Sequence, residues 1–215
     1  MMKNLTLIFF IFSLLSYSQN NFTSARSIEI SENNYEEQLR SSIVKNIELT
    51  NIGPSVMSGR VTDLEVNPNN PTEFYVAYAS GGLWHTKNNG TTFSPIMDNS
   101  MTQNIGDFAI DWKSNSIYVG TGESNSSRSS YPGIGILKSN DNGSTWSNIG
   151  LRDSHHISRV LVNPNNENHI VVAVIGHLYT KNIQRGIFTS FDNGKTWKKS
   201  LSVSYTHLRA HETTC

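Results

Sequence analysis

The sequence predicts an all-β fold, a β-propeller fragment of about three four-stranded blades. An eight-residue pattern ending in an aromatic residue occurs three times, and its acidic or amide residue recurs at Asn88, Asp141 and Asp192, 53 and 51 residues apart. Short apolar runs bounded by Asn, Pro and Gly fill the intervals, as expected for β-strands. A repeat of about 50 residues that contains four short strands is typical of one propeller blade.

Residues 1–18 have the order of a secretory signal peptide. Lys3 precedes the apolar run 5–15, and the small residues Ser16 and Ser18 follow it. The run is shorter than the roughly 20 residues that a transmembrane helix needs. We therefore expect a protein that is secreted, periplasmic or on the cell surface, with no membrane span after cleavage.

The segment 19–50 and the C-terminal tail differ from the repeats. The charged stretch 31–45 predicts a short helix, and residues 47–52 predict a strand that would close the ring of a whole propeller. Residues 203–215 resemble a translated sequencing adapter. We therefore expect the native sequence to end near Ser202, and the residues after it to have no biological role.

The partial propeller covers residues 51–202, with blades at 51–98, 103–150 and 155–202. In each blade two strands flank an Asn- or Asp-containing turn, a third leads into the eight-residue pattern, and a fourth starts at its aromatic residue. The first three strands of the blades are expected at 61–66, 74–78 and 82–86, at 108–110, 117–119 and 135–139, and at 157–162, 170–175 and 186–190. Because propellers have about four to eight blades, we expect further blades in a whole protein.

The repeated pattern predicts a structural turn. Its acid or amide can accept backbone hydrogen bonds, its glycine can adopt positive φ, and its aromatic ring can pack into the blade. The residues with these roles are Asn88, Gly90, Phe93, Asp141, Gly143, Trp146, Asp192, Gly194 and Trp197. A catalytic pair of Asp141 and Asp192 is disfavoured, because equivalent residues of successive blades lie far apart, whereas retaining glycosidases hold their carboxyls about 5 Å apart.

A binding site is expected on the face opposite these turns. Blades two and three carry insertions of about eight or nine residues there, and the entries to the innermost strands line the central channel. When the starts of the three innermost strands are aligned, two positions carry polar residues in every blade. The first column consists of Arg60, Asn104 and His156, and the second consists of Asp63, Asp107 and Arg159. The predicted binding residues are Arg60, Asp107, Arg128, Tyr131, His156, Arg159 and His177. Solvated charges or an inter-blade pair of Asp63 with Arg159 remain the alternative.

Catalytic and metal sites have weaker support in the sequence. Glu123 ends a strand and is expected to face Arg128, so Glu123 and Asp63 are the catalytic candidates. No cofactor or metal is predicted, because adjacent residues on a strand, such as His155 and His156, point to opposite faces.

The composition limits the partners. The chain of 215 residues has 17 basic and 17 acidic side chains and no basic cluster, which argues against a nucleic-acid partner. Its one cysteine, Cys215, excludes a disulfide scaffold. A hydrophobic content of 36% is too high for a disordered chain.

Four segments carry a resemblance to known proteins: 52–61, 75–84, 118–123 and 176–178. On these segments and the repeated turns, residues 51–197 resemble the Asp-box (BNR-repeat) and sortilin/VPS10-like β-propellers that bacteria of the Bacteroidetes type export. Members are often labelled glycosyl hydrolases. Xyloglucan-cleaving relatives have a catalytic Asp where this chain has Ala79, and the Arg-Ile-Pro motif of sialidase-like proteins has only Ile-Gly-Pro54 as its counterpart.

The resemblance and these departures together favour a binding function. We expect an exported Asp-box propeller that acts as a binding or scaffold module for a glycan or peptide, without chemistry in this part. The alternative is a sialidase- or xyloglucanase-like glycoside hydrolase with catalytic carboxylates partly in further blades. An assembly factor, like the propellers that serve photosynthetic systems, is a third hypothesis.

Overall fold

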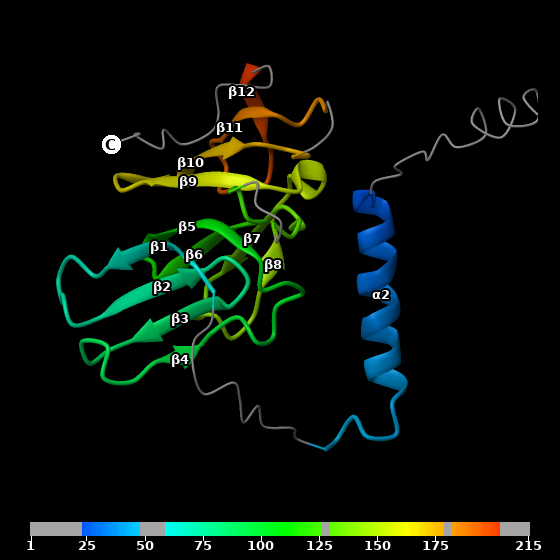
Figure 1. Cartoon of the computed structure of the whole chain (residues 1–215), viewed down its shortest axis with the longest axis horizontal. Helices are drawn as coiled ribbons and strands as arrows, with labels where there is room; N and C mark the ends of the chain where they lie inside the picture. The colour runs from blue at the N-terminus through cyan, green and yellow to red at the C-terminus, as the bar shows by residue number, and fades with distance from the viewer. Residues whose placement is uncertain (1–22, 48–58, 126–129, 179–181, 203–215) are drawn as a thin grey trace, which may run out of the picture.

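The computed structural model describes residues 23–47, 59–125, 130–178 and 182–202. They form three four-stranded antiparallel sheets and one long helix (Figure 1). The predicted signal peptide, the adapter-like tail and nearly all of the predicted ring-closing strand lie outside these residues.

Each sheet is a meander in which neighbouring strands pair in chain order. The predicted fold class is therefore confirmed, and the strands fall on the expected runs. Blade 1 contains β1 (Val61–Val66), β2 (Phe74–Tyr78), β3 (Gly82–Thr86) and β4 (Ser94–Pro95). Blade 2 contains β5 (Ile105–Asp111), β6 (Ser116–Thr121), β7 (Ile136–Ser139) and β8 (Ser147–Asn148). Blade 3 contains β9 (Ile157–Asn163), β10 (Asn166–Val174), β11 (Gly186–Ser190) and β12 (Lys198–Ser202).

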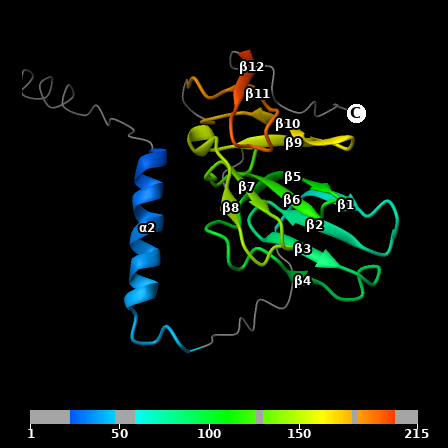
Figure 2. The same cartoon turned by 180° about the vertical axis from the view of Figure 1, so that it is seen from behind.

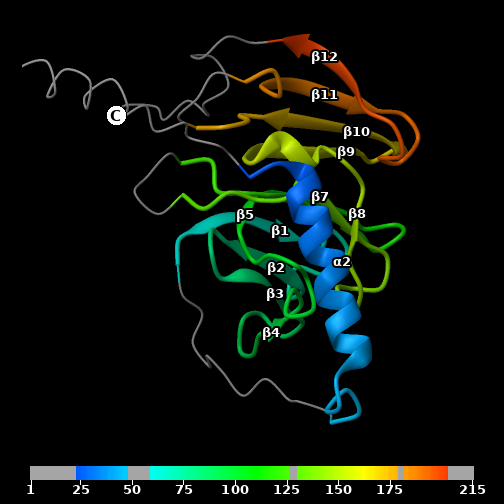
Figure 3. The same ribbon diagram turned by 90° about the vertical axis from the view of Figure 1, so that its right-hand side faces the viewer.

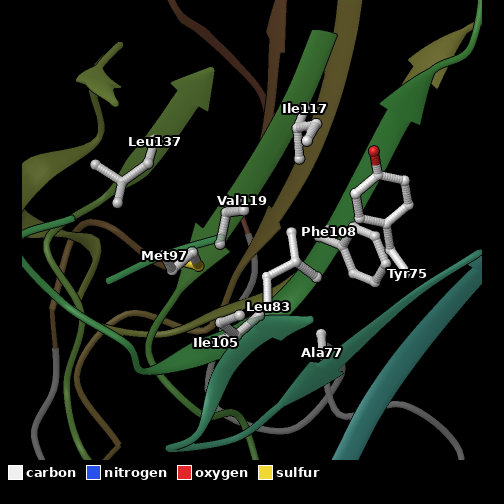
Figure 4. Packing of buried hydrophobic residues seen from close by; sticks show 9 residues of the cluster. All are labelled: Tyr75, Ala77, Leu83, Met97, Ile105, Phe108, Ile117, Val119 and Leu137. Atoms are coloured by element: carbon white, nitrogen blue, oxygen red, sulfur yellow. The ribbon is translucent and has the colours of Figure 1, made fainter. Parts of the chain in front are cut away.

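Blade 2 lies between the other two blades, as the front and back views show (Figures 1 and 2). Every residue of β6 is buried, because alternate side chains of a strand point to opposite faces and both faces are covered. Ile117 and Val119 belong to the apolar cluster shared with blade 1, which Figure 4 shows, whereas Tyr118 belongs to the cluster shared with blade 3. The core therefore consists of two inter-blade layers.

The repeated turn of blade 2 closes on Asp141. Its Oδ1 accepts hydrogen bonds from the Ser139 hydroxyl and the Thr145 backbone N–H, both at 2.8 Å. Asn142 and Gly143 both have positive φ, 55° and 86°, a conformation that glycine and asparagine tolerate best. The turn is thus held by a buried hydroxyl, a carboxylate and two left-handed residues.

The other two repeated turns keep this arrangement. In blade 3, Asp192 accepts from Ser190 and Thr196, and these hydrogen bonds lower the pKa of Asp192 to about 2. In blade 1 the amide oxygen of Asn88 accepts from the Thr92 N–H at 2.9 Å. An amide oxygen therefore serves in place of the carboxylate, because the turn needs an acceptor and not a charge.

The aromatic residue of each later turn packs on the preceding blade, which differs from the expected packing within its own blade. Trp146 Nε1 donates to the Ile96 carbonyl at 3.0 Å, and Trp197 Nε1 donates to the Ile149 carbonyl at 2.7 Å. A Cβ added to Gly143 would lie 2.6 Å from the Ile96 carbonyl oxygen, so glycine allows this close approach of the two blades. The repeated turn is therefore an inter-blade joint.

The helix α2 (Ala25–Ser41) begins six residues before the predicted stretch 31–45, because Ser24 caps it by accepting the Ser27 N–H at 3.2 Å. The helix lies beside the blades, as the side view shows (Figure 3). Ala25 N–H donates to Asp153 Oδ1 at 2.8 Å, and Arg152 pairs with Glu32 at 2.8 Å. Among the described residues, no helix is long and apolar enough to cross a membrane.

The Trp197 joint gives a testable stability effect. Trp197→Phe removes the indole hydrogen bond but keeps an aromatic ring, as Phe93 does in blade 1, so we expect the unfolding free energy to fall by about 1 kcal/mol. Trp197→Ala also leaves a cavity and is expected to cost about 3–5 kcal/mol. Urea unfolding measures both. An unchanged Phe variant would contradict a stabilising hydrogen bond to Ile149.

Candidate functional site

The structure brings three blades together around Glu123, which follows β6. The guanidinium of Arg60, just before β1, forms an ion pair with the Glu123 carboxylate. His156, just before β9, donates its Nδ1–H to the Glu123 carbonyl at 2.7 Å. Two of the three residues in the first predicted column therefore meet one residue of blade 2. The third, Asn104, donates instead to the Pro132 carbonyl at 3.2 Å.

The ion pair has one buried and one accessible partner. The Glu123 side chain is 2% exposed, whereas that of Arg60 is 49% exposed. A buried carboxylate requires such a partner, because an unpaired buried charge is costly. The Glu123 N–H donates to the Tyr131 carbonyl at 3.2 Å, so the main chains of the two residues lie side by side, and the Tyr131 side chain is exposed. The predicted contact with Arg128 falls outside the described residues.

Glycines allow the entry of blade 3 to lie directly on the backbone of blade 2. A Cβ on Gly122 would lie 1.8 Å from the His155 carbonyl oxygen, and one on Gly106 would lie 1.8 Å from that of Ile157. Gly133 N–H donates to the His155 carbonyl at 2.6 Å. This close approach positions both Glu123 and His156. Sequence reasoning did not single out these glycines, although glycine within a strand signals close backbone approach.

Three histidines, His155, His156 and His177, lie together at the entry of blade 3. His155 has φ 55° and ψ −45°, and its ring stacks on His177 with centroids 3.9 Å apart. Burial, together with the smaller effects of the neighbouring His155 and His177, lowers the pKa of His156 to about 4. His156 is therefore neutral at physiological pH. Neither His155 nor His156 is on a strand, because β9 begins at Ile157. Within the described ranges, no three His, Cys, Asp or Glu side chains are grouped to hold a metal.

The second predicted column forms a clamp across the three innermost strands. Arg159 Nη1 lies 3.2 Å from Asp107 Oδ1 and 4.0 Å from Asp63 Oδ2, so the expected pair of Asp63 with Arg159 is the longer contact. The Val160 N–H donates to Asp107 at 2.7 Å. Burial raises the pKa of Asp107, and the carboxylate of Asp63 adds to this effect, although Val160 and Arg159 oppose it. Asp107 is buried, whereas Arg159 remains accessible.

Comparison with known proteins gives the fold. No protein-family model and no curated protein matches the sequence. An ancestral GH74 enzyme aligns with a TM-score of 0.53 and 21% identity, over 69% of this chain and 19% of the enzyme. The GH74 xyloglucanase from Xanthomonas campestris gives 0.47 and 17%, over 67% and 21%. YCF48 bound to D1 peptide gives 0.47 and 14%, over 66% and 41%.

The chain thus spans about a fifth of the length of the GH74 enzymes. At this level of identity the likeness to the ancestral GH74 enzyme shows a common fold and no more. Together with the three sheets, it identifies the described chain as part of a β-propeller.

The pKa of His156 predicts a pH effect on stability. The unfolded chain takes up this proton near pH 6.5, but the folded chain resists it down to about pH 4. The contribution of the neutral His156 to the unfolding free energy is therefore fully present above pH 6.5. It is lost as the pH drops toward 4, and the loss is about 3 kcal/mol. His156→Gln keeps a donor for the Glu123 carbonyl and does not titrate. Urea unfolding at several pH values should show a shallower decline for His156→Gln than for wild type, and parallel curves would contradict the assignment.

The close approach at Gly122 predicts a position-specific cost. Gly122→Ala is strained by its φ of 87° and by the 1.8 Å contact with His155. Gly90→Ala is the matched control, because its φ is 78° but its added Cβ meets nothing nearer than 3.6 Å. We expect Gly90→Ala to cost about 1 kcal/mol in unfolding free energy and Gly122→Ala at least twice that. If both variants lost the same unfolding free energy, backbone strain and not contact between blades would account for the cost at Gly122.

Proposed function

We propose that this chain is part of an exported Asp-box propeller that binds a glycan or peptide at its channel mouth. We call the residues Arg60, Glu123, Tyr131, His156 and His177 the mouth cluster. One observation carries the proposal: the half-exposed Arg60 and the exposed Tyr131 are both attached to the buried Glu123. This arrangement holds two accessible recognition groups on a rigid support.

Both groups have chemistry suited to recognition. An arginine has five N–H donors, so a carboxylate partner does not exhaust them. Tyrosine presents an aromatic face and a hydroxyl at small conformational cost. The ion pair holds the Arg60 side chain, and the backbone hydrogen bond holds the Tyr131 main chain, so part of the freedom that binding would remove is already lost.

Four described carboxylates, among them the catalytic candidate Glu123, are held in structural contacts, which favours binding over hydrolysis. Glu123 is buried and paired, and Asp107 is buried in the clamp with Arg159. Asp141 and Asp192 accept hydrogen bonds inside their turns. A glycosidase needs an acid and a second carboxylate that reach the same sugar. The alternative, a glycoside hydrolase, would therefore depend on Asp63 or another described carboxylate together with carboxylates in further blades.

Glycan and peptide arrays test the proposed binding, with variants that replace tyrosines of similar exposure. We expect Tyr131→Ala to weaken the captured glycan or peptide at least tenfold, because exposed aromatic residues at the centre of a site contribute strongly. Tyr35→Ala, on α2 and equally exposed, should have no effect. Arg60→Lys should weaken binding while it keeps a charge beside Glu123. Equal affinities for Tyr131→Ala and Tyr35→Ala would refute a site at the mouth.

The same protein can be used to test the alternative function, glycoside hydrolysis. Chromogenic glycosides should give no turnover with this chain. Turnover that is lost in Glu123→Gln, while the fold is retained by circular dichroism, would replace the binding proposal with a hydrolase. Export is tested separately, by N-terminal sequencing of the secreted protein, which should begin at Gln19.

A further inference from the structure

Three asparagine–glycine pairs occur in the sequence, and all of them lie in the repeated turns: Asn89-Gly90, Asn142-Gly143 and Asn193-Gly194. Asparagine is a thermolabile residue. It is most reactive before glycine, because glycine has no side chain that would keep its amide nitrogen away from the preceding carboxamide. The turns of blades 2 and 3 form a matched pair, because the blade on which each of them packs is described.

The reaction at such a pair is a spontaneous deamidation. The glycine amide nitrogen loses its proton and attacks the side-chain carbonyl carbon of the asparagine. A new N–C bond closes a succinimide ring, while the C–N bond of the carboxamide breaks and ammonia leaves with the proton that the nitrogen gave up. Water then opens the ring and gives either aspartate or isoaspartate. Water is therefore the only co-reactant.

Both turns hold their glycine nitrogen away from this attack. In each turn the glycine N–H donates to the hydroxyl of the serine that begins the pattern, Ser139 or Ser190, at 2.8 Å. Both glycines are buried, and the asparagines before them have nearly the same φ, 55° and 61°. Attack therefore requires a local opening that breaks this hydrogen bond, and the backbone protects the two sites equally.

The asparagine side chains of the two turns differ. Asn193 Oδ1 accepts hydrogen bonds from the Tyr118 hydroxyl at 2.9 Å and from Lys138 Nζ at 3.0 Å, both on blade 2. These two donors hold the carbonyl group that the glycine nitrogen would have to reach. Asn142, in contrast, is exposed, and its side chain forms no hydrogen bond with any described residue. It borders a hollow between blades 1 and 2, so water reaches its carboxamide.

Blade 1 has different residues at the two donor positions. By strand register, Tyr75 and His85 stand there. Their rings stack on each other with centroids 4.0 Å apart, and His85 Nε2 is hydrogen-bonded to a carboxylate of the same blade at 3.0 Å. Neither of them forms a described hydrogen bond to Asn142, which therefore lacks the protection that blade 2 gives to Asn193.

We propose that Asn142 is a deamidation site of this protein and that the contacts with blade 2 protect Asn193 from the same reaction. Either product at Asn142 adds a negative charge next to the carboxylate of the turn. Isoaspartate also lengthens the main chain of a turn whose glycine lies against the Ile96 carbonyl of blade 1. Deamidation therefore loosens the joint between blades 1 and 2.

Peptide mapping by mass spectrometry tests the proposal on the full chain, kept slightly above neutral pH with and without urea. Urea removes the turns, so the ratio of the unfolded to the folded rate measures the protection at each site. We expect the protection to be about tenfold greater at Asn193 than at Asn142, because two more hydrogen bonds must break before Asn193 reacts. Equal protection, or no aspartate and isoaspartate at Asn142 in the folded chain, would overturn the proposal.

Variants of blade 2 test the cause of the difference. Lys138→Met and Tyr118→Phe each remove one donor and should raise the rate at Asn193 in the folded chain about fivefold. Tyr75→Phe, the matched change in blade 1, should leave this rate as it is. The rate at Asn142 reports a general loss of stability, because such a loss raises both rates. A rate at Asn193 that neither blade 2 variant raises would refute the protection by blade 2.

The loosened joint has a readout of its own. Ion exchange separates the deamidated chain by its added charge, and its urea unfolding midpoint should lie below that of the intact chain. Asn142→Asp supplies the charge without isoaspartate, so its midpoint should lie between the two. Equal midpoints for all three chains would contradict a loosened joint.

Discussion

Every part of this structure depends on the need to cover both faces of a small sheet. A four-stranded blade has no interior of its own, so its apolar side chains become buried only between two blades. In blade 2 this leaves all six residues of β6 buried. The turns that join β7 to β8 and β11 to β12 serve the same need, because Trp146 and Trp197 reach back to carbonyl groups of the preceding blade. The repeated turns therefore also hold neighbouring blades together.

The mouth cluster is a consequence of that packing. Backbone from blade 3 approaches blade 2 so closely at Gly106 and Gly122 that no side chain fits between them. The approach places His156 against Glu123 from one side, while Arg60 reaches it from blade 1. A group fixed by two inter-blade joints moves little. Its rigidity suits recognition more than chemistry that requires an exposed acid.

Burial also decides which charges exist at the mouth. Burial lowers the pKa of His156, which is therefore neutral, and raises the pKa of Asp107, whereas Arg159 and the Val160 N–H lower it. The charges that remain accessible are the guanidiniums of Arg60 and Arg159, each supported by a carboxylate of blade 2. The mouth therefore presents arginine to solvent and keeps most of its carboxylates inside.

The sequence by itself determined the blade repeat, the strands and the turn residues, because they follow from periodicity within about 50 residues and from the φ preferences of Gly and Asn. It also named Arg60, Glu123, His156, Asp107 and Arg159. Only the tertiary structure decided their partners: Arg60 meets Glu123, and Arg159 lies nearer to Asp107 than to Asp63. It likewise decided that the tryptophans pack on the preceding blade, and that Gly106, Gly122 and Gly133 lie at one joint. These contacts join residues from different repeats, and their distances depend on how closely two sheets pack, which no local pattern records.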